Sequence, residues 1–207
     1  MSLDQQYLQE LSELFLRNLR KSDFYVQMAE SERFKLENKL QLDAAKGFIP
    51  LIPGAAQDDL ENLMDAVEEE LNIELPTEVV EILRQADGFS FNGVCLYGVD
   101  PELCGDGFES GPGILAETAL QWSDYPEAAQ SFLFVGDSDL WYFAIELSTQ
   151  MPVALERSTH RIAHRFRSAE EMVNDMLRTA LGIFDEKSDS IGGNNNQADF
   201  GGANAIG

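Results

Sequence analysis

The order of hydrophobic patterns along the chain predicts an α+β fold, in which an antiparallel-dominated twisted sheet is flanked by helices. Helical periodicity fills the first part of the sequence, and segments rich in β-branched and aromatic residues follow one another between residues 89 and 156. A last amphipathic helix then closes the series. Strands joined by short turns pair antiparallel, so this order favours a meander covered by helices.

Residues 1–56 are expected to form an extra helical segment and a connector. Apolar residues recur three or four positions apart from Leu3 to about Ala45, which indicates two helices with a break that Ser22 can cap. Prolines and glycines then fill GFIPLIPGAAQ, residues 47–57. Proline lacks the N–H donor that a helix or a central strand requires, so this stretch is predicted to be an extended connector.

The main domain is expected at residues 57–186, and it opens with two helices. Asp58 or Asp59 can cap the first, whose apolar residues repeat at helical spacing. The second is expected to start at Pro76, because proline suits a first helical turn. It is expected to stop at Gly88, in a left-handed cap.

A group of strands follows these helices. FSFNGVCLYGVD is rich in strand-forming residues around Asn92-Gly93, which predicts a hairpin or an irregular strand. After an acidic loop and a short helix or turn, residues 131–135, 141–147 and 152–156 predict an antiparallel meander.

The end of the domain is expected to be one more strand and a helix. His160 and His164 stand four apart, a spacing that suits metal ligands on a helix, but the alternation of residues 157–167 favours a strand. Ser168 and Glu171 form a capping box for a closing helix. The tail, residues 187–207, is rich in Gly, Asn and Ala and is expected to be disordered.

Negative charge is concentrated in the middle of the chain. The 37 acidic and 14 basic residues give a net charge of −23, and residues 58–156 hold 22 acids and a single base, Arg84. Such a charge would repel nucleic acids and anionic membranes. No apolar stretch is long enough to cross a membrane, and the N-terminus carries acids where a signal peptide carries bases. A cytoplasmic protein is therefore expected, with Cys95 and Cys104 reduced.

Sequence motifs of catalysis and cofactor binding are missing. There is no GxSxG elbow, Walker phosphate loop or Rossmann fingerprint, so neither enzymatic activity nor a cofactor is expected. Asp137 and Asp139 begin like a calcium loop, but Trp141 and Phe143 occupy positions where such a loop needs ligands. A hairpin turn without metal is expected there.

Residues 57–184 resemble the SUKH superfamily, a group rich in bacterial immunity proteins. An acidic helix runs into LNIELPTEVVEILRQADGF, where Asp87-Gly88 occupies the family's terminal Asn-Gly or Asp-Gly position. LYGV, FLFVGDSDLWYFAIEL, STQMPVALE and FRSAEEMVNDML then follow in the family's order. The resemblance covers somewhat more than half of the chain and leaves out the N-terminal helices and the tail.

This resemblance implies a non-enzymatic protein that binds and neutralises a cognate toxin delivered between competing bacteria. Many such toxins act on nucleic acids or nucleotides, and a nuclease has to be basic to approach phosphates. The acidic block is the electrostatic complement of such a toxin domain. A regulatory or scaffolding adaptor of the same fold, which uses the N-terminal helices to join an assembly, is the alternative.

Contacts with the partner are expected on the acidic surface between Asp87 and Asp139, because aromatic anchors surrounded by charge are typical of interface hot spots. The predicted contacts are the acids Asp87, Asp100, Glu102, Asp106, Glu109, Asp124, Asp137 and Asp139 and the aromatic residues Tyr97, Trp122 and Tyr125. Core packing is the competing interpretation for aromatic residues, and a solvated loop or a cation site for the acids near residues 100–109.

Overall fold

The computed structural model describes residues 2–47, 49–104 and 111–183. The tail for which disorder is predicted, residues 187–207, lies outside the described residues. The α-helices are α1 (Gln5–Lys21), α2 (Asp23–Gln27), α3 (Glu30–Ala45), α4 (Gln57–Leu71), α5 (Thr77–Leu83), α6 (Ile114–Asp124) and α7 (Ala169–Leu181). Two single turns of 3₁₀-helix are η1 (Pro101–Leu103) and η2 (Pro126–Ala128).

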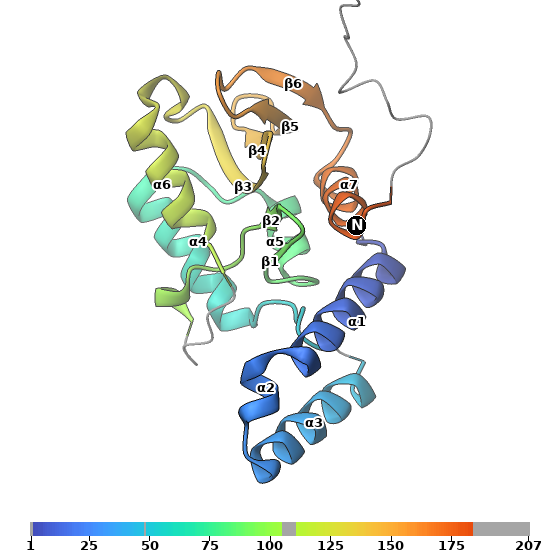
Figure 1. The fold of residues 1–207 in the computed structure, drawn as a ribbon. Coiled ribbons are helices and arrows are strands. Elements are labelled where there is room, and N and C mark those ends of the chain that lie inside the picture. The colour runs from blue at the N-terminus through green and yellow to red at the C-terminus, as the bar shows by residue number, and fades with distance from the viewer. Residues whose placement is uncertain (1, 48, 105–110, 184–207) are drawn as a thin grey trace, which may run out of the picture.

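A six-stranded antiparallel sheet forms the centre of the molecule (Figure 1). Its strands are β1 (Phe89–Phe91), β2 (Val94–Leu96), β3 (Phe132–Ser138), β4 (Trp141–Glu146), β5 (Met151–Glu156) and β6 (Ile162–Arg165). They lie in the sheet in the order in which they occur in the sequence, and each pairs antiparallel with the next. The predicted α+β fold class, with its antiparallel sheet and flanking helices, is confirmed.

Two glycines explain how the first strands are placed. Asn92 and Gly93, with φ of 51° and 75°, form the two-residue turn between β1 and β2 that positive φ angles favour in hairpins. Gly136 lies where β3 passes between β2 and α7. A Cβ there would be 2.5 Å from the Cys95 carbonyl oxygen, a backbone atom of β2, and 2.6 Å from the flexible end of the Met176 side chain. The close approach of β2 to β3 at this position therefore requires glycine.

Helices cover both sides of the sheet, with α6 on one side and α7 on the other (Figure 1). Thr118 of α6 binds β3 directly, because its hydroxyl accepts a hydrogen bond from the Phe134 N–H at 3.1 Å and donates to the Phe134 carbonyl at 3.3 Å. The Ser168 hydroxyl caps α7 as predicted and accepts from the Glu171 N–H at 3.1 Å. The Glu171 carboxylate accepts from the N–H of Arg167, one residue earlier than a capping box requires.

Residues 5–45 form three helices where two were predicted, because the chain breaks at Ala29 as well as at Ser22. Two predicted boundaries of the next helices are also wrong. The N-cap of α4 is Ala56, so Asp58 and Asp59 lie inside the first turn, where carboxylates favour the positive end of the helix dipole. Helix α5 ends at Leu83, and the left-handed Gly88 lies beyond it. The chain leaves the helix early because it forms a hydrogen bond with the connector instead. The Asp87 N–H donates to the Pro53 carbonyl oxygen at 2.8 Å.

The first helix belongs to the same hydrophobic core as the sheet. Leu3, Leu8 and Leu11 are fully buried, and α1 packs against α7. The Leu3 N–H also donates to the side chain of Gln85 at 2.8 Å. In contrast, α2 and α3 project from the body at the end of α1 (Figure 1). Among the described residues, no helix combines the length and the apolar character that crossing a membrane requires.

Candidate functional site

Helix α4 carries a ridge of exposed carboxylates. Its apolar residues Leu60, Leu63, Val67 and Leu71 are buried, and the remainder of the helix faces solvent. The exposed acids of this helix are Asp58, Glu61, Asp65, Glu68, Glu69 and Glu70. The sequence of α4 contains no lysine, arginine or histidine, so these charges are not balanced within the helix.

The acidic surface continues from α4 onto η1 and α6. The Asn62 side-chain amide donates to the Leu103 carbonyl at 3.2 Å, which holds η1 and its exposed Glu102 against α4. Helix α6 packs beside α4 on the same side of the molecule (Figure 1) and presents Asp124, and η2 adds Glu127. We call the exposed acids of α4, η1, α6 and η2 the acidic face.

Arg157 connects two strands of the sheet, β3 and β4. Arg157, after β5, donates from Nη1 to a carboxylate oxygen of Asp137 at 2.9 Å and to the Ser138 carbonyl at 2.8 Å. Its guanidinium also lies over the ring of Tyr142, 4.6 Å from the ring centre. Arg157 thus combines an ion pair with a cation–π contact.

Aromatic rings extend from that contact toward the end of α6. The His160 ring stacks on Tyr142 with centres 5.3 Å apart, and Tyr125 contacts it with centres 3.9 Å apart. Within the described residues, Nε2 of His160 is buried and has no hydrogen-bond partner. Burial lowers the pKa of His160 against the opposing charge of Glu127, so this imidazole favours its neutral form.

Two carboxyl groups, one on β3 and one on α6, have raised pKa values. Burial raises the pKa of Asp137 although Arg157 pairs with it. Burial, and then the charge of Asp137, raise the pKa of Glu117 on α6. The same causes raise the pKa of Cys95 to about 11, so its thiol is protonated at neutral pH and is a poor nucleophile. Negative charge is therefore crowded here as well as on the outer surface.

The structure places the predicted contact residues in different environments. Glu102, Asp124 and Asp139 are exposed, and Trp122, Tyr125 and Asp137 are half-buried. The Nε1–H group of Trp122 donates a hydrogen bond to the Phe132 carbonyl oxygen at 2.9 Å, so this indole already has its hydrogen-bond partner within the fold. The predicted contacts Asp106 and Glu109 lie outside the described residues.

The structure buries the side chains of two predicted contacts, Asp100 and Tyr97. Asp100 is 3% exposed, and its carboxylate accepts from the backbone N–H groups of Leu115 and Ala116 at 2.9 and 2.8 Å. It caps the N-terminus of α6 from a distant part of the sequence. Tyr97 is 2% exposed and lies in the core.

Asp87 is also engaged within the fold. Its carboxylate accepts from the Val99 N–H at 2.7 Å, and its backbone N–H binds the connector. Asp87 therefore fixes the chain between α5 and η1, and this bond leaves its Oδ1 atom less able to accept from a partner.

The ridge on α4 was missed among the predicted contacts, which begin only at Asp87. The signal was present, because the same helical spacing that predicts the buried leucines also places the acids of residues 58–70 on the opposite side. Among the described residues, no three His, Cys, Asp or Glu side chains come close enough to hold a metal ion. The like charges of the acidic face add up to a field that attracts cationic groups.

No protein-family model matches the chain, and no curated protein matches it.

Proposed function

We propose that this protein is a non-enzymatic immunity protein that acts in the cytoplasm. It binds a basic toxin domain through the acidic face and blocks it. The observation that supports this most directly is the concentration of exposed carboxylates on α4, η1, α6 and η2, whose sequences contain no basic residue. The one base in residues 58–156, Arg84, pairs with Glu81 of α5, which is not one of the acids of the acidic face.

The physical effect of such a face is long-range attraction. An enzyme that cleaves nucleic acid needs a positively charged surface to approach phosphates. The acidic face, which carries only negative charge, attracts such an enzyme. Electrostatic steering of this kind speeds association by roughly 10–10³-fold and weakens as salt screens it. The toxin as partner is suggested by the ordered motifs of the SUKH resemblance, and the charge supports a basic partner independently.

The test uses the product of the gene directly upstream, which should be the toxin if this is an immunity protein. Co-expression should restore the growth of cells that make it, and the two proteins should bind with an affinity that falls steeply as NaCl increases. Reversing Glu61→Lys, Asp65→Lys and Glu68→Lys together should lower the association rate by at least about tenfold.

The matched control reverses three exposed acids away from this face, Glu13→Lys, Asp23→Lys and Glu30→Lys. It makes the same change in net charge but leaves the acidic face intact. If the two triple variants lower the association rate equally, the rate depends on net charge and not on the acidic face. Growth that is not restored by co-expression would rule out the immunity function.

A further inference from the structure

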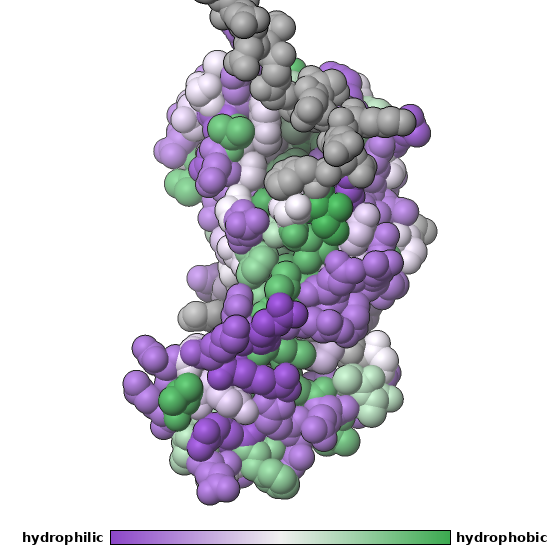
Figure 2. Space-filling view, turned by 45° about the vertical axis from the view of Figure 1, so that its right-hand side comes forward, coloured by the Kyte–Doolittle hydropathy of each residue, from purple (hydrophilic) through white to green (hydrophobic). Residues whose placement is uncertain are grey.

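Exposed apolar side chains occur on the projecting helices and on the helices of the acidic face. Among the described residues, the large hydrophobic side chains that face solvent are Phe24, Val26, Phe34, Leu42, Met64, Leu120 and Leu140. The first four belong to α2 and α3, and Figure 2 shows apolar side chains at the surface of this lower, helical part of the molecule. Met64 lies on α4 among exposed carboxylates. Covering it with a partner would be favourable, because its apolar surface would leave water.

A hollow lies beside Met64 at the C-terminal end of α4. Its volume of about 450 Å³ lies within the roughly 300–1,000 Å³ of ligand pockets. Its apolar lining consists of Met64, which is 41% exposed, the half-buried Ile73 and the buried Leu75. The left-handed C-cap Asn72, with φ of 54°, ends α4 and lets residues 73–75 face the last turns of the helix across the hollow.

Three carboxylates line the same hollow. Asp65 and Glu68 come from α4 and Glu74 from the segment that follows it, and all three side chains are exposed. Within the described residues, none of these carboxylates has a hydrogen-bond or ion-pair partner. No basic side chain lines the hollow, so its negative charge is uncompensated.

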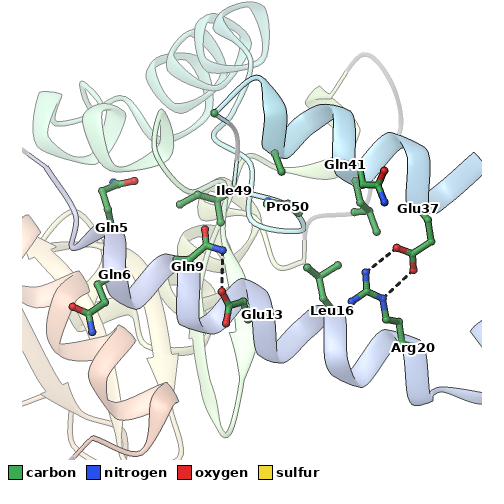
Figure 3. Close-up of a pocket in the computed structure, with 13 residues that line it drawn as sticks. Gln5, Gln6, Gln9, Glu13, Leu16, Arg20, Glu37, Gln41, Ile49 and Pro50 are labelled. Atoms are coloured by element: carbon green, nitrogen blue, oxygen red, sulfur yellow. Dashed lines mark hydrogen bonds and ion pairs between the residues drawn. The ribbon is translucent and has the colours of Figure 1, made fainter.

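A larger cleft between α1 and α3, of about 720 Å³, differs from this hollow in its charges (Figure 3). Its two carboxylates already have partners. Glu37 accepts from Nε and Nη2 of Arg20 at 2.9 and 2.7 Å, and Glu13 accepts from the Gln9 side chain at 3.2 Å. The bonds from Arg20 and then from the Tyr25 hydroxyl lower the pKa of Glu37 to about 2. The cleft thus contains a base beside its acids, whereas acids alone charge the hollow at α4.

The lining of the hollow favours a long organic cation over a metal ion. Among the described residues, no three acidic, histidine or cysteine side chains come close enough to hold a metal, so Asp65, Glu68 and Glu74 stand too far apart for one. An arginine side chain fits both parts of the lining. Its aliphatic stem packs on apolar residues, and its planar guanidinium offers donors to separate carboxylates. The ammonium of lysine is compact and more strongly hydrated, so it matches this lining less well.

We infer that this hollow is the subsite of the acidic face that binds an arginine side chain of the partner. The stem of the arginine lies on Met64 and Ile73, and its guanidinium lies among the three carboxylates. The inference rests on the proposed function for the identity of the partner, a basic toxin domain. It adds which side chain is bound and where. The summed charge of the acidic face speeds the encounter, whereas the contact in the hollow forms on docking and slows dissociation.

The first measurement uses the full chain without a toxin, labelled with ¹³C at its methionine methyl groups. The sequence has six methionines, and Met64→Leu identifies the NMR signal of Met64. N-acetyl-arginine amide should shift this signal saturably and leave the signals of Met172 and Met176, which are buried in α7, in place. N-acetyl-citrulline amide is the matched probe, because citrulline resembles arginine in shape but carries no charge. It should cause no saturable shift.

Charge variants separate the hollow from the rest of α4. Asp65→Asn, Glu68→Gln and Glu74→Gln together should raise the Kd for N-acetyl-arginine amide by about fivefold or more, because they remove the charge of its acceptors.

The matched control, Asp58→Asn with Glu61→Gln and Glu70→Gln, makes the same change in net charge at exposed acids that do not line the hollow. In about 0.15 M NaCl it should change the Kd by less than about twofold. Equal effects of the two triple variants would overturn the inference. So would a Met64 signal that does not move, or one that citrulline shifts as strongly as arginine.

Met64→Ala tests the subsite in the complex with the product of the gene directly upstream. It should raise the dissociation rate by about fivefold or more and change the association rate by less than about twofold, because it removes contact area but no charge. Leu140→Ala is the control, since this leucine is 67% exposed on the β3–β4 turn, and it should leave both rates unchanged. An equal rise in the dissociation rate of the two variants would contradict a contact at Met64.

The two proposals fail in different ways. If co-expression does not restore growth but N-acetyl-arginine amide still shifts the Met64 signal, the immunity function is rejected and the arginine subsite is retained. If co-expression restores growth and the Met64 signal does not move, the arginine subsite alone is rejected.

Discussion

The guanidinium of Arg157 lies 4.6 Å from the centre of the Tyr142 ring. The same group donates to Asp137 at 2.9 Å, so one side chain connects the crowded acids beneath α6 with the row of aromatic rings that ends at Tyr125. Tyr125 is the C-cap of α6, and α6 and the neighbouring α4 carry most of the acidic face.

Replacing Arg157 with alanine should lower the free energy of unfolding by about 1–2 kcal/mol, because it removes a partly exposed ion pair and a cation–π contact together. Urea denaturation at pH 7 measures this change. Arg157→Lys should recover only part of the loss, since an ammonium lacks the planar fork of donors. Arg161→Ala, at an exposed arginine of the same segment, should change stability by less than about 0.5 kcal/mol.

Glu117 should make the protein more stable in mild acid than at pH 8. Its pKa is raised in the folded state, chiefly by burial, so the folded protein binds this proton more tightly than the unfolded chain. The resulting stabilisation is complete below the ordinary value of 4.5 and is lost as pH rises through the raised pKa. Melting temperatures of the wild type and Glu117→Gln at several pH values between 4.5 and 8 measure it.

Glu117→Gln should melt higher than the wild type at pH 8, because it removes a desolvated charge close to Asp137. The difference should shrink as pH falls. Glu61→Gln on the exposed side of α4 is the control, and an equal gain from it would mean that net charge, rather than burial of Glu117, is responsible.

Loss of the Asp100 carboxylate should destabilise α6. Asp100→Ala leaves the N–H groups of Leu115 and Ala116 without their acceptors, and a cost of about 2 kcal/mol is expected. Urea denaturation measures the loss, with Glu102→Ala as the exposed control two residues away. If Asp100→Ala is as stable as that control, the carboxylate does not act as a cap.

The first helix should be as important to stability as the sheet. Leu11 is fully buried, so Leu11→Ala should lower the free energy of unfolding by about 2–4 kcal/mol. Leu140→Ala removes the same atoms from a side chain that is 67% exposed and should cost less than about 0.5 kcal/mol. Similar values for the two variants would contradict the placement of α1 in the core.

Local signals predict most of the fold. The Asn92-Gly93 turn, the meander from β3 to β5 and the Ser168 cap each depend on neighbouring residues, and each is present in the structure. The end of α5 could not be predicted in this way, because it depends on a connector about 30 residues earlier in the sequence. The Pro53 carbonyl oxygen of that connector accepts a hydrogen bond from the Asp87 N–H.

The candidate site was harder to predict than the fold for the same reason. A count of acids locates the negative segment, but it cannot tell Asp100, which binds two N–H groups of α6, from Glu102, which faces solvent. Tyr97 likewise appears in sequence as an aromatic residue near acids, and only its burial in the folded structure shows that it lies inside.

The contact between α1 and α7 has a consequence for how the chain folds during synthesis. The strands can pair one after another as they leave the ribosome, since each binds the next in sequence. Helix α1 is made before them, yet the Asp4 N–H binds the side chain of Asn174, which is made 170 residues later. The leucines of α1 that are buried in the folded protein therefore stay exposed during most of translation. A chaperone that binds exposed apolar side chains can bind them during that interval.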